Sequence, residues 1–341
     1  MKAKSQMRRY GCVAAALVAV GSLIPSTAHA QYSGLYFFGD SFTDVGNATG
    51  LALANNLPNP TPPPYAPGRF SNGPVWTEYF SAALGKPASA GPGWLGQGNN
   101  YAVGGALTGN LGALNSPTGM LNQGVTFASQ HTTGVAPGGL FVLWGGGNDI
   151  IAAAQLASPL AQQQAVALAV SNIGTLATGL RANFGATNFL VPFLPDVGLA
   201  PLYAGDAAHA AVASSLTTLF NQLLGASLAQ FNGTGANAMG WSVNNLVTNI
   251  LYDAKTGGSR YGITNTTDPC FTSIVPNACD NSLFVDQLHP TNVVEKLIAQ
   301  SAYNRAVLGQ DVSVIPEPAT LALTGIGLGM LGLAFRRKRV A

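Results

Sequence analysis

The sequence predicts a three-layer α/β/α sandwich built around a mainly parallel β-sheet. Short apolar runs at 35–38, 139–144 and 187–193 indicate buried strands, because each is too short for a helix and stops at glycine, proline or polar residues. Long segments with helical spacing, 152–180 and 207–229, follow the second and third runs. Strands that alternate with helices are typical of parallel βαβ units, so we expect one α/β domain without internal repeats.

A proline-rich segment separates the first strand from the next helix. Residues 56–74 should form an irregular loop, because proline lacks a backbone N–H and fixes φ. We expect this loop to form a wall of a substrate pocket beside the first strand. Arg69 is expected to anchor the loop through a salt bridge rather than to orient a substrate. The next helix should begin at Trp76, and with Phe80 and the loop it should set the depth of the pocket.

Three further elements complete the predicted sheet and its cover. Residues 98–106 indicate a short strand that ends at paired glycines, where a ligand can approach the backbone N–H groups closely. Another short strand should begin at Trp241 and lead into a helix at 244–252. An amphipathic helix is expected at 293–307.

The N-terminal 30 residues indicate a secretory signal peptide. Four basic residues precede a short apolar run at 12–24, and small residues, Ala28 and Ala30, occupy the minus-three and minus-one positions. We therefore expect signal peptidase to remove residues 1–30 by cutting between Ala30 and Gln31. The alternative, an N-terminal transmembrane anchor, is disfavoured because the apolar run is short.

Residues 313–341 have the composition of a membrane-inserted sorting segment. Pro316-Glu317-Pro318 leads into seventeen uncharged residues at 319–335, which are followed by four basic residues. As a helix this run spans about 25 Å, a slightly short bilayer crossing, and the basic cluster should stay in the cytoplasm. The pattern resembles the PEP-CTERM sorting signal of certain Gram-negative bacteria. That resemblance implies membrane association through 319–335 before sorting, cutting by an exosortase, and release or attachment at the outer surface. A plain C-terminal anchor is the alternative.

The charge of the chain lies mainly in these terminal segments. The whole sequence has a formal charge of +2, but residues 31–313 hold seven Lys and Arg against twelve Asp and Glu, a formal charge of −5. A nucleic-acid-binding protein needs a basic patch to neutralise phosphates, and this body has none. We therefore expect no nucleic-acid partner.

Two cysteines remain after the signal peptide is removed. Cys270 and Cys279 are close in sequence and would enter an oxidising compartment, so we expect one disulfide, with a pair of free thiols as the alternative. Two cysteines at this spacing without a nearby histidine do not indicate zinc, and no other metal site is expected.

Polar side chains follow the predicted strands at the points where ligands bind in open α/β sheets. Ser41 comes just after the first strand and is a candidate nucleophile, although Asp40 and Ser41 could instead cap the next segment. Asn148 follows the strand at 139–144, and its amide can donate to a developing oxyanion. Asp149 is expected to cap a helix that begins near Ile150.

One of the three histidines of the exported body has an acidic residue at a useful spacing. Asp286 precedes His289 by three residues, and on a turn its carboxylate can reach Nδ1 of the imidazole and fix its tautomer. His131 and His209 are expected to be structural or exposed, without partner residues. Taken alone, the Asp-x-x-His spacing is too common to assign a function.

Together these residues supply the groups that acyl transfer needs. Ser41 would attack the carbonyl carbon, His289 would act as general base and then general acid, and Asp286 would orient the imidazole. The oxyanion would be bound by the backbone N–H groups of Ser41 and Gly105 and by the side chain of Asn148. Asp40 is then expected to hold the turn around the nucleophile.

Four stretches in this order resemble the GDSL, or SGNH, hydrolase family. They are GDSFTDVGN at 39–47, NYAVGGA at 100–106, GGND at 146–149 and DQLH at 286–289. The family signature has leucine where this chain has Phe42, a difference that leaves the nucleophile intact. GRFSNG at 68–73 and YGITN at 261–265 are similar to stretches of the secreted lipase and esterase branch.

The resemblance implies a flavodoxin-like fold over residues 31–312, ester hydrolysis, and no metal or organic cofactor. The expected substrate is a lipid acyl ester or an O-acetylated glycan, met in the periplasm, at the outer surface or outside the cell. An α/β-hydrolase is disfavoured because the chain lacks a mid-chain Gly-x-Ser-x-Gly elbow. A non-catalytic GDSL-like surface protein that binds matrix polysaccharide is a second hypothesis, although a binding module does not require an aspartate that orients a base.

Overall fold

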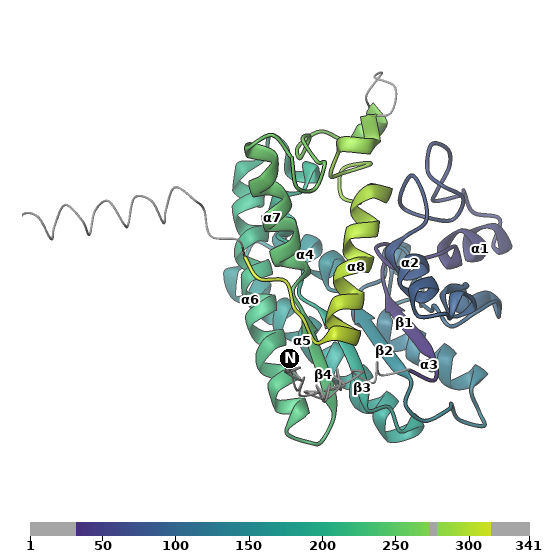
Figure 1. The fold of residues 1–341 in the computed structure, drawn as a ribbon. Coiled ribbons are helices and arrows are strands. Elements are labelled where there is room, and N and C mark those ends of the chain that lie inside the picture. Colours follow the sequence, from purple (N-terminus) through teal and green to yellow (C-terminus); the bar gives the residue numbers. More distant parts are fainter. Residues whose placement is uncertain (1–31, 273–277, 315–341) are drawn as a thin grey trace, which may run out of the picture.

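The computed structural model describes residues 32–272 and 278–314. The expected signal peptide at 1–30 and the expected membrane helix at 319–335 lie outside these residues. The described chain has four parallel strands and eight α-helices, shown in Figure 1. The strands are β1 (Leu35–Gly39), β2 (Leu140–Trp144), β3 (Asn188–Pro192) and β4 (Asn237–Trp241). The helices are α1 (Asn47–Ala54), α2 (Trp76–Ala83), α3 (Met120–Gln130), α4 (Gly147–Ala154), α5 (Pro159–Phe184), α6 (Ala207–Asn232), α7 (Val243–Lys255) and α8 (Asn292–Leu308).

The sheet is flavodoxin-like in its strand order. The four strands pair in the order β1-β2-β3-β4, all parallel. The segment around Asn100 runs parallel to β1 on the side away from β2, and Tyr101 N–H donates to the carbonyl of Phe37 at 2.7 Å. Counting this segment as the second strand gives the order 2-1-3-4-5, in which ligands bind beyond the carboxyl end of the first strand. The predicted α/β fold is therefore confirmed, although the 98–106 segment is a ladder of a few bonds rather than a full strand.

Helices cover both faces of the sheet. α8 packs against α2 and α7 on one face, and α5 packs against α3, α4 and α6 on the other (Figure 1). In the described part of the chain, α5 alone is long and apolar enough to cross a membrane, but it belongs to this helical layer and packs on its neighbours. The chain thus forms the expected three layers.

Three buried tryptophans join the sheet to α2. Trp76 of α2 lies 5.4 Å from Trp144 of β2 and 5.2 Å from Trp241 of β4, measured between ring centroids. All three rings are at most 2% exposed. Tightly packed indoles of this size contribute strongly to the apolar core, so they hold the carboxyl ends of β2 and β4 at fixed positions beneath the site.

Two predicted elements differ from the structure. β4 ends at Trp241, whereas the sequence predicts that a strand begins there; the preceding residues Asn237–Gly240 lack the apolar run that marks the other strands. The helix expected at 152–180 is interrupted at 155–158. Ser158 caps α5 by accepting a hydrogen bond from the N–H of Ala161, and Pro159 occupies the first turn, where a missing N–H costs nothing.

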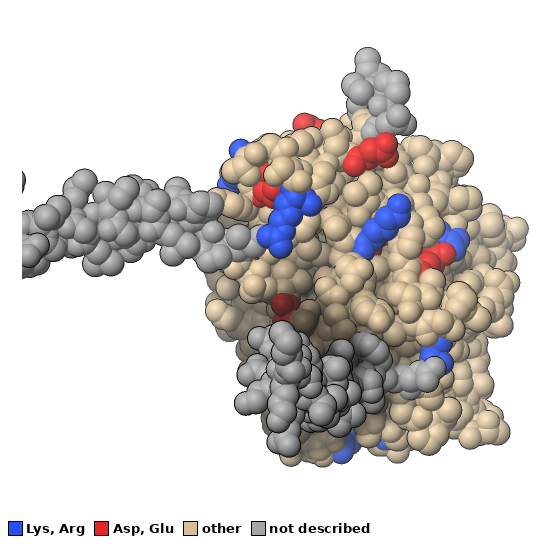
Figure 2. Space-filling view, in the orientation of Figure 1, with Lys and Arg blue, Asp and Glu red and all other residues tan. Residues whose placement is uncertain are grey.

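The surface carries few charged side chains. Figure 2 shows Lys and Arg scattered singly over one face. Arg69 makes the anchoring salt bridge that the sequence predicts, with Nη2 2.6 Å from a carboxylate oxygen of Glu78 on α2.

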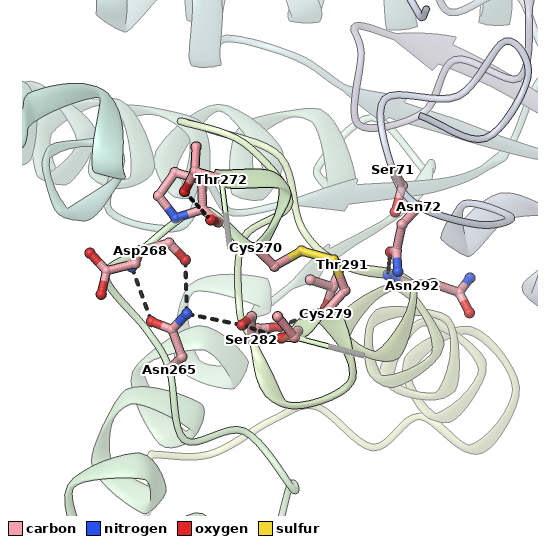
Figure 3. The surroundings of a disulfide bond; sticks show 12 residues. Ser71, Asn72, Asn265, Asp268, Cys270, Thr272, Cys279, Ser282, Thr291 and Asn292 are labelled. Atoms are coloured by element: carbon pink, nitrogen blue, oxygen red, sulfur yellow. Dashed lines mark hydrogen bonds between the residues drawn. A yellow bond between two sulfur atoms is a disulfide. The ribbon is translucent and has the colours of Figure 1, made fainter. Parts of the chain in front are cut away.

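Between α7 and α8 the chain forms a loop closed by a disulfide. Cys270 and Cys279 are bonded through their sulfurs, with their Cα atoms 5.1 Å apart, as Figure 3 shows. Asn265 braces the same loop, because its side chain donates to the carbonyl of Asp268 and to the hydroxyl of Ser282, both at 2.9 Å.

Candidate active site

A short turn at the end of β1 presents Ser41. The carboxylate of Asp40 accepts a hydrogen bond from the N–H of Phe42 at 3.1 Å, and its carbonyl accepts from the N–H groups of Thr43 and Asp44 at 3.0 Å. Asp40 therefore closes the turn around the serine, as the sequence predicts. Burial raises the pKa of Asp40 to about 7, although the bond from Phe42 and the nearby His289 counteract this effect.

The structure brings Ser41, His289 and Asp286 into one chain of hydrogen bonds. His289 Nε2 lies 2.7 Å from Ser41 Oγ, and its Nδ1 lies 2.7 Å from Asp286 Oδ2. Ser41 and His289 are 248 positions apart in sequence, so the fold alone creates their contact. This is the arrangement in which an imidazole can accept a proton from a hydroxyl.

A local turn before α8 presents Asp286 and His289. Asp286 Oδ1 accepts from the N–H groups of Leu288 at 2.8 Å and His289 at 2.7 Å, and Val285 N–H donates to the carbonyl of His289. Burial by itself would raise the pKa of Asp286, but hydrogen bonds from His289 and Tyr65 outweigh it and lower the pKa to about 2. Asp286 is therefore an anion at neutral pH and can stabilise an imidazolium.

Three donors predicted to bind an oxyanion lie around the same turn. Gly105 has φ +77°, a left-handed conformation that glycine adopts without strain. Among the described residues, the backbone N–H groups of Ser41 and Gly105 donate to no protein acceptor. Asn148 donates one amide hydrogen to the carbonyl of Ala106 at 2.9 Å, which leaves the second hydrogen for a ligand.

Asp44 ties the Gly104–Gly105 turn to the segment that follows Ser41, a role that its sequence context does not predict. Its carboxylate accepts four backbone hydrogen bonds, from Gly46, Asn47 and Ala48 at the start of α1 and from Gly104. The Gly104 bond, at 2.8 Å, holds the residue directly before Gly105. Burial raises the pKa of Asp44 to about 6 in spite of these bonds.

Comparison with known proteins agrees with this geometry. Residues 35–302, most of the chain, match the family model described as GDSL-like lipase/acylhydrolase. The chain belongs to the GDSL-like lipase/acylhydrolase family. Residues 314–339 match the PEP-CTERM protein-sorting motif, which indicates export and sorting to the cell envelope or outer surface.

Several curated proteins are similar to this GDSL-family chain. It is 27% identical to the esterase EstA of Pseudomonas aeruginosa over 360 residues, covering 90% of this chain and 52% of the relative. It is 29% identical to lipase 1 of Photorhabdus luminescens over 196 residues, covering 57% of this chain and 27% of the relative. The chain thus spans about half the length of the first of these relatives. A solved GDSL-family structure from Veillonella parvula aligns with a TM-score of 0.40 at 13% identity, covering 79% of this chain and 95% of that one.

Asp149 of the GDSL-family chain does not cap the helix as predicted. α4 begins at Gly147, so Asp149 lies inside its first turn. Its carboxylate instead accepts from the N–H of Thr108 at 3.0 Å and from the Thr108 hydroxyl at 2.8 Å. Asp149 therefore fastens the loop after Gly105 to α4, a tertiary contact that a local capping rule does not foresee.

The other two histidines stand apart from this site. His131 stacks on Phe127, with ring centroids 4.2 Å apart, and its Nδ1 lies 3.0 Å from the Phe127 carbonyl. His209 has a partner, contrary to the prediction, because its Nδ1 lies 2.7 Å from Asp206 Oδ2. The sequence signal for this pair is the Asp-x-x-His spacing at 206–209.

An apolar pocket opens at Ser41. Its lining includes Ser41, Asp40 and Asn148, and the rest of the lining is largely aliphatic and aromatic. The apolar lining includes Phe42, Leu194, Leu199, Val247, Leu251, Leu283, Phe284, Leu288, Val294 and Ile298. These residues come from the turn after β1, from the loop after β3, from α7, from α8 and from the segment before His289. The lining of this pocket includes none of Trp76, Phe80 and the loop 56–74, which the sequence predicts to shape it. The loop borders the site beside His289 instead, where the Phe70 ring lies 5.1 Å from the imidazole.

Proposed function

We propose that the exported domain, residues 31–312, hydrolyses carboxylic esters through an acyl-enzyme formed on Ser41. The hydrogen-bond chain from Ser41 to His289 to Asp286 is the observation that carries this proposal. Family membership and the esterase and lipase names of the relatives support the same reaction class.

The geometry suggests how each bond is made and broken. Ser41 Oγ bonds to the carbonyl carbon while its proton passes to His289 Nε2, and the resulting imidazolium faces the Asp286 carboxylate. The alkoxide that forms would be held by the N–H groups of Ser41 and Gly105 and by the Asn148 amide. When the carbon–oxygen bond to the alcohol breaks, His289 returns the proton to the leaving oxygen. A water molecule then attacks the acyl carbon as His289 takes its proton. The bond to Ser41 breaks, His289 returns the proton to Ser41 Oγ, and the carboxylic acid is released.

The apolar pocket supports an aliphatic acyl chain as the group transferred to Ser41. Burial of each methylene contributes about 0.8 kcal/mol, so a chain of several carbons gains affinity that an acetyl group lacks. Val247 and Leu251 of α7, which follows the strand farthest from β1, would contact the chain at a distance from Ser41. We therefore favour acyl esters over O-acetylated glycans.

The test of the reaction is replacement of the nucleophile. Ser41→Ala should lower hydrolysis of a p-nitrophenyl ester by about 10⁴-fold or more, and it should abolish labelling by a fluorophosphonate. Ser129→Ala, at an exposed serine on α3, is the matched control. A Ser41→Ala rate within a few fold of wild type would contradict the proposal. Absence of labelling in the wild-type protein would favour the polysaccharide-binding hypothesis.

The test of the acyl pocket is a chain-length profile. Rates on p-nitrophenyl acetate, butyrate, octanoate and palmitate should rise beyond acetate in the wild type. Val247→Trp should lower the rate on the longer esters while the acetate rate changes little, and Val125→Trp, on the exposed face of α3, should change neither. A wild-type preference for acetate or for acetylated xylan would point to the glycan substrate instead.

The terminal segments complete the proposal. Signal peptidase would remove residues 1–30, and an exosortase-type enzyme would cut near Pro316–Pro318 after the 319–335 helix has held the protein in the membrane. Intact-mass analysis of the exported protein should find Gln31 as its first residue. A mass that retains either terminal segment would contradict this processing.

A further inference from the structure

The hydroxyl of Tyr65 bonds the aspartate of the Ser41–His289–Asp286 chain. Tyr65 Oη donates to Asp286 Oδ2 at 2.5 Å, the same oxygen that faces Nδ1 of His289. Asp286 Oδ1 already accepts two backbone N–H groups. A carboxylate offers about four acceptor sites, so Tyr65 completes the set. Tyr65 lies outside all four family blocks.

The proline-rich loop holds this hydroxyl in place. The Tyr65 ring packs edge-on against Phe271, with centroids 5.0 Å apart, and against Phe70 at 6.3 Å. Phe70 in turn lies 5.1 Å from the His289 ring. Tyr65 is therefore fixed by contacts from its own loop and from the disulfide-closed loop.

The proline-rich loop also forms hydrogen bonds with the residues that follow His289 in sequence. Ser71 Oγ donates to the carbonyl of Pro290 at 2.9 Å, and Asn292 N–H donates to Asn72 Oδ1 at 2.7 Å; Figure 3 shows Asn72 beside Asn292. Residues 65–72 thus form hydrogen bonds with both ends of the segment 286–292. The bond from Tyr65 to Asp286 is one of this set rather than an isolated contact.

We propose that Tyr65 is a positioning residue that acts through Asp286, fixing the carboxylate against His289 and setting how strongly the imidazolium is held. The proposal rests on the proposed ester hydrolysis. A hydrogen bond to the charged carboxylate draws electron density away from Oδ2. Without the hydroxyl, Oδ2 is directed at His289 Nδ1 alone. The protonated imidazole is then stabilised more, and the carboxylate is freer to rotate out of line.

The other charged groups near His289 come from different elements and stay unchanged when Tyr65 is altered. Asp40 acts on His289 from the turn after β1, and Asp149 acts on Asp40 from α4. Neither is hydrogen-bonded to Tyr65. A change in the pH profile of a Tyr65 variant is therefore traceable to Asp286.

The experiment compares Tyr65→Phe with Tyr79→Phe. Tyr79 supplies the control because its hydroxyl bonds Asn292, on the same segment, and not Asp286. For Tyr65→Phe we expect kcat to fall by about tenfold with KM little changed, and the acid limb of kcat/KM to move up by about half a pH unit, as expected for one hydrogen bond to a charged group. Tyr79→Phe should leave the pH profile in place.

A double-mutant cycle separates this role from a structural one. In an Asp286→Asn background, Tyr65→Phe should change the residual rate by less than about twofold, because its partner is already altered. An equal loss in both backgrounds, or a pH profile of Tyr65→Phe that superimposes on the wild type, would overturn the proposal. An active Ser41→Ala variant would instead refute the ester-hydrolase mechanism, so the two failures are distinguishable.

Discussion

The chain contains two aspartate–histidine pairs with the same spacing and nearly the same local geometry. In both pairs, 206–209 and 286–289, the histidine Nδ1 lies 2.7 Å from the aspartate Oδ2. In both, the histidine N–H donates to Oδ1 of the aspartate, at 3.1 Å in the first pair and 2.7 Å in the second. A three-residue separation therefore brings the carboxylate to Nδ1 of the imidazole in two different surroundings.

The two pairs differ in what surrounds them. The side chains of Asp206 and His209 are 50% and 43% exposed, and Asp206 caps the N-terminus of α6. The side chains of Asp286 and His289 are 20% and 12% exposed, and Ser41 faces the free nitrogen of the imidazole. Spacing thus brings the carboxylate to the imidazole, and tertiary structure adds Ser41 and the shielding from water that the proposed acyl transfer needs.

Replacing each aspartate separately by asparagine tests this distinction, and the largest effect is expected at Asp286. Asp286→Asn should lower kcat by about 10⁴-fold, because an amide favours the wrong imidazole tautomer and removes the negative charge. Asp206→Asn should leave ester hydrolysis unchanged. A near-wild-type rate for Asp286→Asn would exclude Asp286 from the mechanism.

The proposed oxyanion donors are a second feature of the site around Ser41 and His289. Asn148→Ala should lower kcat by about 10²- to 10³-fold, because one donor to the alkoxide is lost. Asn172→Ala is a control, because the Asn172 amide donates to the hydroxyl of Thr108, in the loop after Gly105, and Asn172 does not line the pocket at Ser41. A Tm of Asn148→Ala far below that of the control would show that the Ala106 bond supports folding more than catalysis.

Burial at Asp40 and hydrogen bonds at Asp206 shift the two pKa values in opposite directions, so the two sites give opposite dependence of stability on pH. Burial raises the pKa of Asp40 to about 7 from 3.8, so its contribution to stability is present in acid and is lost as the pH rises from about 4 through about 7. The full loss is about 4 kcal/mol for one such group. Asp40→Asn should flatten the fall in unfolding free energy between pH 5 and pH 8, measured by urea denaturation.

Asp206 supplies the contrast in the same measurement. Hydrogen bonds from His209 lower its pKa, so its contribution is present above pH 4 and is lost on further acidification. Asp206→Asn should leave the slope between pH 5 and pH 8 as in the wild type. An unchanged slope in Asp40→Asn as well would show that Asp44 and Glu295, which are also buried with raised pKa, carry the effect.

The smallest effect is expected at His209. His209→Ala removes an exposed pair, and exposed pairs of this kind contribute little to stability. The rate on p-nitrophenyl esters should equal that of wild type within twofold, whereas His289→Ala should be as severe as Ser41→Ala. A large loss in His209→Ala would mean that the pair at 206–209 has a function of its own.

Local features of the fold were predictable from sequence, and the errors have physical causes. The strands at 35–38 and 139–144 were predicted because continuous apolar runs mark strands buried on both faces. The sequence misplaces β4 because it is an edge strand whose residues are partly exposed, so a continuous apolar run does not mark it. The interruption at 155–158 has a local cause, the Ser158 cap and Pro159, which apolar spacing alone does not reveal. The bond from Asp149 to Thr108 depends on a neighbour 41 positions away.

By itself, the sequence determined β1, β2 and β3, the turns that follow them, the Asp286–His289 pair and the C-terminal sorting motif. Each of these follows from residues within a few positions of one another, where backbone geometry limits the possibilities. The tertiary structure alone decided that Ser41 meets His289, that Tyr65 bonds Asp286, and that α7 and α8 rather than the proline-rich loop line the pocket. These contacts join segments up to 248 residues apart, and close packing of whole helices and strands sets them.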